Sequence, residues 1–346
     1  MNIDMKRLFN TLMIMAAVSL SVASCDIEKK FDTTIPQYPL TQLVKSATAT
    51  VGDETVEGVV DNAAHTVTFV FNDTKDFTST EIKFNFPSRV ILKEGAVEEL
   101  TADLNAGKTY TFVVNNLEED ITYTVTAYKA SIVQVDRTQC SVITGLDGDA
   151  DPSKLEKAAS NNGYGTGCAF LFDGKWMKKK DGYTDVHYQC FGWEMNSLKG
   201  SNGENFGTAY TVDFGAPMRV ARMRFLPYRA YTESAAALYE IYAWILDGEP
   251  SGDWSNWQLI ATVDDSAKWN IIKEVGEGET HPLITEGTTV DFVYSDVPLA
   301  RYYRVKIVKN FYEYYQDKMN SAWAQRKYWY DVSELEAWRY NLDSEE

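Results

Sequence analysis

The sequence predicts an all-β protein made of two β-sandwiches, and three observations support this. Short runs in which apolar and polar residues alternate recur along most of the chain after residue 66, and this period of two is typical of half-buried strands. Loops rich in Asp, Asn and Gly separate the early runs at intervals of about ten residues, as in small antiparallel sandwiches. The length of 346 residues allows two or three domains, and the later part of the chain contains no long helical pattern.

Residues 1–24 have the pattern of a secretory signal. Lys6 and Arg7 precede a broken apolar run that is too short for a membrane span of about 20 residues. The following Val-Ala-Ser-Cys resembles the bacterial lipobox, which implies lipidation of Cys25. The alternative is an ordinary signal peptide with a coincidental cysteine. Acidic residues after Cys25 resemble the surface-export signal of Bacteroidetes lipoproteins, so we expect an outer-membrane protein that meets the membrane only through its lipid anchor.

The charge and composition favour a neutral ligand. The chain has 50 acidic and 33 basic residues and a net charge of −17, which gives it no electrostatic attraction to nucleic acid or to an anionic lipid surface. The 21 Tyr and 9 Trp are more aromatic side chains than packing alone requires.

Three cysteines follow Cys25, namely Cys140, Cys168 and Cys190. They allow at most one internal disulfide, and Cys168–Cys190 is the favoured pair because both residues flank the same loop region. Three buried free thiols are an equally good interpretation. No cysteine spacing resembles a zinc site.

Residues 25–40 contain two prolines and predict a polar tether. Residues 41–130 predict the first sandwich, which resembles the immunoglobulin-like spacer domains of Bacteroidetes surface lipoproteins. Its clearest expected strands are 66–71, 82–86, 109–114 and 121–128.

Residues 131–346 predict a second sandwich of the jelly-roll type. A bridge over residues 131–170 leads to an apolar strand, 169–172, that ends at Asp173 and Gly174. Further strands are expected at 210–214, 221–225, 239–245, 257–263, 301–308 and 330–340. Trp244, Trp257 and Trp338 fall inside strand patterns and are assigned to the core.

Five segments of this second part, in this order, resemble the discoidin or coagulation-factor type C domain, which has a galactose-binding-like fold. They are the Asp-Gly strand end, Val-Asp-Phe-Gly at 212–215, Trp-Ser-Asn-Trp at 254–257, Arg-Tyr-Tyr-Arg-Val at 301–305 and Ser-Glu-Leu-Glu-Ala-Trp at 333–338. The resemblance covers about residues 138–341, and similar domains occur in lipoproteins of Bacteroidetes polysaccharide-utilisation loci. It implies a ligand site, often for sugar, in the loops at one end of the sandwich.

The same resemblance implies a structural Ca²⁺ held by Asp173 and Glu334, since Ca²⁺ takes six to eight oxygen ligands at about 2.3–2.6 Å. The sequence departs from the family pattern, because Lys178, Lys179 and Lys180 follow Asp173 and would repel a cation. The alternative is an Asp-Gly turn and a solvated Glu334 without metal.

The ligand-binding candidates are aromatic and planar polar residues in the expected loops. An aromatic ring can cover the apolar face of a pyranose, while planar polar groups bind its hydroxyls. The candidates are Trp176, Trp193, Tyr228, Arg229, Trp323 and Trp329. For each aromatic taken alone, core packing is the competing interpretation.

No catalytic constellation stands out, because the three histidines are scattered and no nucleophile or metalloprotease motif occurs. The Glu334 and Glu336 pair is expected to be solvated on a surface strand. The sequence therefore predicts a non-catalytic surface lipoprotein that binds a glycan or oligosaccharide for a neighbouring outer-membrane uptake system. The alternative is a structural or adhesive protein that binds a protein partner in an outer-membrane complex.

Overall fold

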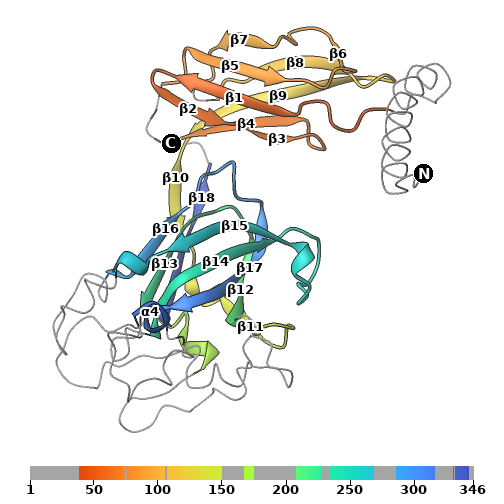
Figure 1. Cartoon of the computed structure of the whole chain (residues 1–346). Coiled ribbons are helices and arrows are strands. Elements are labelled where there is room, and N and C mark those ends of the chain that lie inside the picture. Colours follow the sequence, from red (N-terminus) through yellow and green to blue (C-terminus); the bar gives the residue numbers. More distant parts are fainter. Residues whose placement is uncertain are drawn as a thin grey trace, which may run out of the picture.

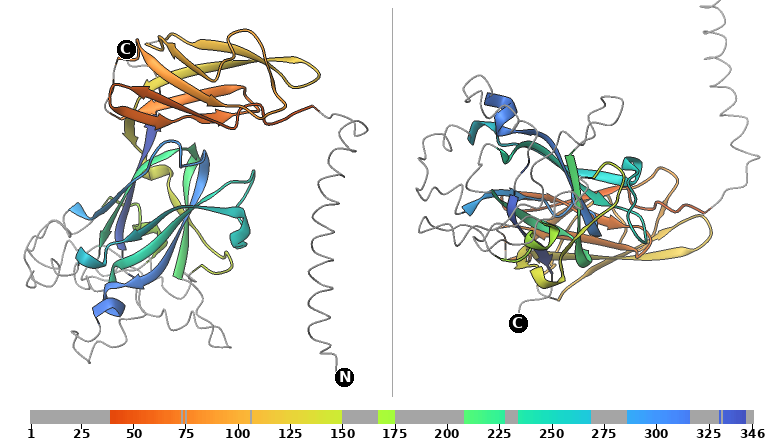
Figure 2. Two further views of the ribbon diagram at one scale, coloured as in Figure 1. Left: turned by 45° about the horizontal axis from the view of Figure 1, so that its top comes forward. Right: turned by 90° about the horizontal axis from the view of Figure 1, so that it is seen from below.

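The computed structural model describes residues 39–149, 167–174, 208–227, 234–268, 286–315 and 330–342, except residues 73, 75, 106 and 331. Within these ranges strands predominate, with one short α-helix, α4 (Phe311–Tyr315), and several 3-10 turns. The prediction of an all-β chain is confirmed. Figures 1 and 2 show two sandwiches joined through one stretch of extended chain. None of the helices in the described ranges has the length and hydrophobicity of a membrane span.

Nine strands of the described chain form the first sandwich. They are β1 (Ser46–Val51), β2 (Glu54–Glu57), β3 (Val59–Asp61), β4 (Thr66–Phe71), β5 (Thr80–Asn85), β6 (Ile91–Leu92), β7 (Glu99–Ala102), β8 (Tyr110–Asn115) and β9 (Asp120–Lys129). One sheet has the order β2-β1-β5-β7 and the other β3-β4-β9-β8-β6. The pairs are antiparallel except β4 with β9.

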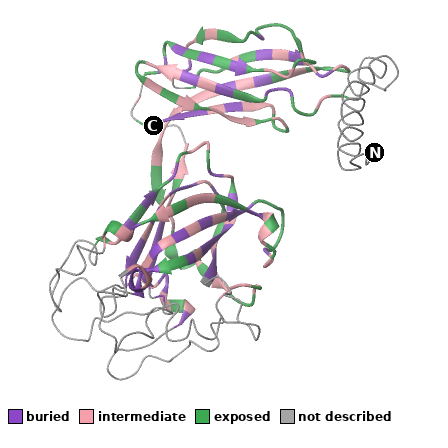
Figure 3. Cartoon of the chain, in the orientation of Figure 1, coloured by how far each residue is buried: buried purple, intermediate pink, exposed green. Residues whose placement is uncertain are grey.

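The alternation that predicted these strands also builds their core. Phe69, Phe112 and Tyr123 are almost fully buried between the two sheets, and the rings of Phe112 and Tyr123 stack with centroids 5.2 Å apart. Figure 3 shows buried and more exposed residues alternating along these strands. All four strands predicted in this part of the chain are present, with ends shifted by at most two residues.

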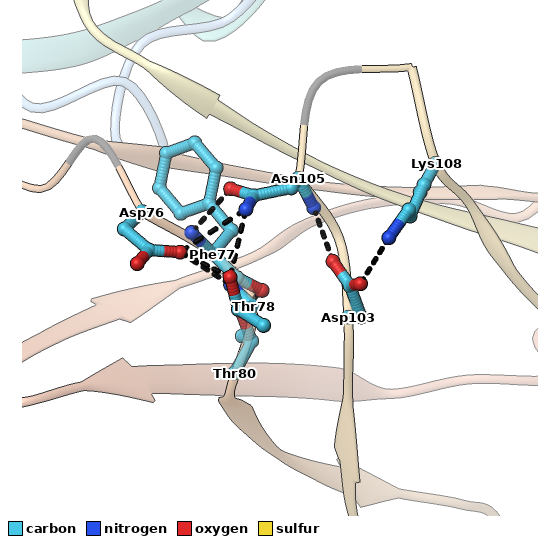
Figure 4. Close-up of polar contacts among 7 residues, drawn as sticks. All are labelled: Asp76, Phe77, Thr78, Thr80, Asp103, Asn105 and Lys108. Carbon is cyan, nitrogen blue, oxygen red and sulfur yellow. Dashed lines mark hydrogen bonds and ion pairs between the residues drawn. The ribbon is translucent and has the colours of Figure 1, made fainter.

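Asn105 ties together two loops of the first sandwich (Figure 4). Its side-chain oxygen accepts a hydrogen bond from the N–H of Phe77 at 2.7 Å, and its amide nitrogen donates to Asp76 at 3.1 Å and to the Thr78 hydroxyl at 2.8 Å. Phe77 is 6% exposed and packs against Phe71 with centroids 5.3 Å apart. The network therefore fixes the loop that carries Phe77 into the core.

Replacing Asn105 with Ala is expected to lower the free energy of unfolding of the first sandwich by about 1–3 kcal/mol, because the Phe77 N–H loses its acceptor. Urea unfolding followed by far-UV circular dichroism measures the change. Lys108→Ala is the matched control, since its ion pair with Asp103 is largely exposed and should contribute less than about 1 kcal/mol. Equal effects of the two substitutions would contradict this role of Asn105.

Within the described ranges, nine further strands form the second sandwich. They are β10 (Ser131–Gln134), β11 (Ser141–Ile143), β12 (Thr208–Met218), β13 (Val220–Pro227), β14 (Ala236–Trp244), β15 (Trp257–Asp264), β16 (Thr288–Asp291), β17 (Ala300–Asn310) and β18 (Val332–Asn341). One sheet has the order β10-β18-β13-β16 and the other β11-β12-β17-β14-β15, all antiparallel. Tyr303, Val305 and Ile307 are buried in the core, as the alternation predicted.

Two expectations for the start of this part are wrong. The expected bridge contains two strands, because β10 pairs with β18 and β11 with β12. The expected strand 169–172 is a 3-10 helix, Cys168–Phe170, followed by a turn. Leu171 and Phe172 are nevertheless buried, and the Leu171 carbonyl accepts a hydrogen bond from the Leu335 N–H at 2.9 Å. The apolar run thus reflects contact with the core rather than strand pairing.

Of the three tryptophans assigned to the core, Trp244 and Trp257 are buried as predicted, whereas Trp338 is not. Trp244 and Trp257 form a small cluster of their own with Tyr302. Alternation along β17 and β14 places this cluster on the outer face of the five-stranded sheet, opposite Tyr303. Trp338 is only half-buried and lies under the Arg224 guanidinium, 5.4 Å from its ring centroid.

Candidate functional site

One end of the second sandwich gathers the strand ends that flank the candidate ligand residues. Pro227, where β13 ends, pairs with Val332, where β18 begins. In the other sheet, the first residue of β12 pairs near the end of β17, and Ala236 at the start of β14 pairs with Asn310. Residues of both sheets, including Pro227, Ala236 and Val332, line one small cavity of about 20 Å³. The two sheets therefore meet at this end, which we call the binding end.

The six ligand-binding candidates lie in the segments between these strand ends. Residues 175–207 precede β12, residues 228–233 follow β13, and residues 316–329 precede β18. Trp176, Trp193, Tyr228, Arg229, Trp323 and Trp329 all lie outside the residues that the structure describes, as do Cys25 and Cys190. The structure thus brings together the flanks of the three segments and leaves the positions of these side chains as predictions.

The two carboxylates predicted to bind calcium lie close together beside the binding end. Both oxygens of Glu334 accept a hydrogen bond from the Gly174 N–H at 3.0 Å. Gly174 has φ +75°, a left-handed conformation that favours glycine, and it turns the chain directly after Asp173. A residue from β18 and a distant turn are thereby joined at one point.

Glu334 is fully buried and Glu336 is 9% exposed, so the expectation of solvated carboxylates is wrong. Burial, together with the negative charges of Asp173 and Glu336, raises the pKa of Glu334 to about 8, although the Gly174 hydrogen bond and the Arg137 guanidinium act in the opposite direction. A carboxyl group in such surroundings holds its proton near neutral pH unless a cation stabilises the ionised form.

The carboxylate pair fits part of a calcium site. Ca²⁺ prefers carboxylate and carbonyl oxygens, and Asp173 and Glu334 would supply the first kind. In the described part of the chain, no group of three or more His, Cys, Asp or Glu side chains is placed to hold a metal ion. Any remaining ligands would therefore have to be main-chain oxygens, water or residues outside the described ranges.

Beside this pair lies a pocket of about 350 Å³ that sequence analysis did not predict. It is lined by Gln134, Val135, Asp136, Arg137, Thr138, Cys140, Phe172, Phe214, Leu335, Glu336 and Ala337. Most of these residues belong to the chain between β10 and β11 or to β18. Their sequence carries no motif, and only the pairing of β10 with β18 brings them together.

Cys140 is a half-buried free thiol, and Cys168 is half-buried against the same core. Burial raises the pKa of the Cys140 thiol to about 12, with smaller contributions from nearby carboxylates. The expected pair of Cys168 with Cys190 stays a prediction, because Cys190 lies outside the described residues.

No protein-family model matches the chain, and no curated protein matches it. Among solved structures, it is similar to a SusE-like protein, at 14% identity and a TM-score of 0.46 over 88% of this chain and 99% of the other. It is also similar to the family 32 carbohydrate-binding module of NanJ from Clostridium perfringens in complex with galactose, at 11% identity and a TM-score of 0.34 over 60% of this chain and 100% of that one. A third similar structure is the C-terminal domain of a chitobiase from Bacteroides fragilis, at 14% identity and a TM-score of 0.33 over 61% of this chain and 99% of that one.

Proposed function

We propose that this chain is a non-catalytic, lipid-anchored outer-membrane protein that binds carbohydrate at the binding end of its second sandwich. Cys25 would carry the lipid, and the first sandwich would serve as a spacer. The captured glycan would pass to a neighbouring uptake or hydrolase system.

The observation that carries this proposal is the position of the three candidate segments at one end of the second sandwich. Residues 175–207, 228–233 and 316–329 are far apart in sequence, yet the strands that flank them end at the same end of one sandwich. These segments contain four tryptophans, Trp176, Trp193, Trp323 and Trp329. Aromatic rings next to planar polar groups are suited to bind a sugar ring.

Calcium would stabilise this site by fixing the point where the first candidate segment leaves the sandwich. Asp173 and Glu334 would hold the ion, and its charge would replace the proton that burial favours on Glu334. The turn after Asp173 leads directly into residues 175–207, so the ion would anchor the first candidate segment to β18.

Affinity electrophoresis of the mature chain, produced without its lipid, tests the proposal against plant, host and microbial polysaccharides. We expect at least one polysaccharide to retard the chain in millimolar calcium, and Trp176→Ala or Trp323→Ala to abolish that retardation. Trp338→Phe is the control, because Trp338 pairs with Gln134 and Arg222, away from the binding end. Chelation of calcium should weaken the retardation.

Absence of retardation by every polysaccharide would contradict the proposal. The protein-partner alternative would then be tested by capturing outer-membrane proteins on the mature chain.

A further inference from the structure

We propose that the pocket between β10 and β11 is a second carbohydrate subsite, separate from the binding end, that takes a single neutral pyranose ring. This inference rests on the proposed function and adds a position and a ligand class to it. The pocket of about 350 Å³ is near the lower limit of small-ligand sites, about 300–1,000 Å³. One sugar ring therefore suits it better than a chain of rings.

The pocket exists because the chain crosses from one sheet to the other at this edge. Val135 still donates its N–H to the Ala337 carbonyl at 2.8 Å, as if β10 continued. The chain then makes a 3-10 helix, Arg137–Gln139, capped by Asp136, whose carboxylate accepts from the Thr138 N–H at 2.9 Å and from the Thr138 hydroxyl at 2.7 Å. The crossing segment is thus tied to β18 at its start and closed by a local cap, and it forms one wall of the pocket.

Arg137 supplies hydrogen-bond donors to the pocket. A Cβ atom on Gly174 would lie 2.1 Å from the Nη1 atom of Arg137, so the guanidinium rests directly on this glycine. Within the described part of the chain, the Arg137 guanidinium makes no hydrogen bond or ion pair, only longer-range attractions to Asp136 and Glu334. Arg137 is exposed, so its guanidinium N–H groups are available to a ligand.

Gln134 and Glu336 supply acceptors in fixed positions. The Gln134 amide nitrogen donates to one oxygen of Glu336 at 3.2 Å, and the Arg224 guanidinium binds the other oxygen. This leaves the Gln134 carbonyl oxygen and the second lone pairs of the Glu336 carboxylate as acceptors. Planar donors and acceptors that are already oriented suit the neighbouring hydroxyls of a sugar.

The apolar wall and the local charge select the class of ligand. Phe172 and Phe214 are 8% and 3% exposed, pack edge to face with ring centroids 6.3 Å apart, and form the apolar floor of the pocket. The carboxylates of Asp136 and Glu336 line the pocket, and the guanidiniums of Arg137 and Arg224 balance their charge. Without a net positive charge, the pocket offers an anionic sugar no electrostatic attraction, which favours a neutral ring.

Titrations of the mature chain with D-galactose, N-acetyl-D-galactosamine, D-glucose, D-mannose and D-glucuronate, followed by saturation-transfer difference NMR in millimolar calcium, test this subsite. We expect a neutral sugar to bind and D-glucuronate not to bind. Arg137→Met should lower the affinity for that sugar by about tenfold or more, because a charged hydrogen-bond donor is lost. Gln134→Ala, on the exposed edge strand β10, should lower the same affinity several-fold without a risk to folding.

Arg222→Met is the matched control, because Arg222 pairs with Asp291 on the other side of β13 and is expected to leave the affinity unchanged. Unchanged affinity in Arg137→Met and Gln134→Ala, combined with loss in Trp323→Ala, would overturn the subsite while the proposed function stands. Preferential binding of D-glucuronate would overturn the ligand class. If no monosaccharide binds the wild-type chain although a polysaccharide retards it, the subsite is also rejected.

Discussion

Replacing Arg304 with Met is expected to lower the free energy of unfolding of the second sandwich by about 3–5 kcal/mol, because it leaves a buried carboxylate without its partner. Arg304 is fully buried, and its Nε donates to Asp149 at 2.7 Å. Burial already raises the pKa of Asp149, while Arg304 and a hydrogen bond from Thr211 lower it. Without Arg304, the ionised form of Asp149 would lose most of its stabilisation.

Arg304 also joins two loops to the outer face of the five-stranded sheet. Its guanidinium donates to the carbonyl of Asp147 at 2.6 Å and to that of Gly252 at 3.2 Å. It lies 3.8 Å from the ring centroid of Trp254, a stacking that adds cation–π attraction. The substitution therefore loosens both loops together with the ion pair.

Urea unfolding followed by tryptophan fluorescence measures this effect selectively, because all nine tryptophans lie at residue 176 or beyond. Lys306→Met is the matched control on the same strand and face, since its ion pair with Glu240 is partly exposed and should contribute less than about 1 kcal/mol. The double variant Arg304→Met, Asp149→Leu should recover part of the loss, because no unpaired charge remains. Equal destabilisation by the Arg304 and Lys306 substitutions would contradict the account.

The second large effect is a loss of stability with rising pH in calcium-free solution. The folded pKa of Glu334 is about 8 against a usual value of 4.5, so between these values the unfolded chain binds fewer protons than the folded chain. Stability that is present below pH 4.5 is therefore lost as the pH rises to 8. The expected loss from this group is about 3–5 kcal/mol.

The difference between the wild-type chain and Glu334→Gln isolates this contribution in urea unfolding at a series of pH values. Gln keeps an acceptor for the Gly174 N–H and cannot ionise, so the variant should lack the loss and be more stable than the wild type at pH 8. Millimolar calcium should remove the loss in the wild type by favouring the ionised carboxylates. Glu98→Gln, at an exposed site in the first sandwich, is the control. A parallel pH dependence of wild type and Glu334→Gln would contradict the burial of an uncompensated carboxyl group.

The strands could be predicted from the sequence because their alternation records one buried and one exposed face. β4 has the predicted bounds, and the closing strand of the second sandwich was shifted by only one or two residues. The Leu171 and Phe172 segment was misassigned, because a buried turn and a buried strand leave the same apolar signal over four residues. Local sequence does not distinguish them.

The site was predictable only in part. Asp173 and Glu334 could be paired through a family resemblance, but the burial of Glu334 depends on packing between segments that are far apart in sequence. Arg137 gave no signal, because its position depends on the crossing from β10 to β11 and on the close approach of Gly174. Such contacts are set by topology rather than by a local pattern.

The most direct test of the central claim is isothermal titration of the mature chain with the polysaccharide that retards it most, in calcium. We expect saturable binding that Trp176→Ala and Trp323→Ala abolish and that Trp338→Phe leaves unchanged. Binding that survives both substitutions at the binding end, or no heat with any polysaccharide, would contradict carbohydrate binding at this end of the second sandwich.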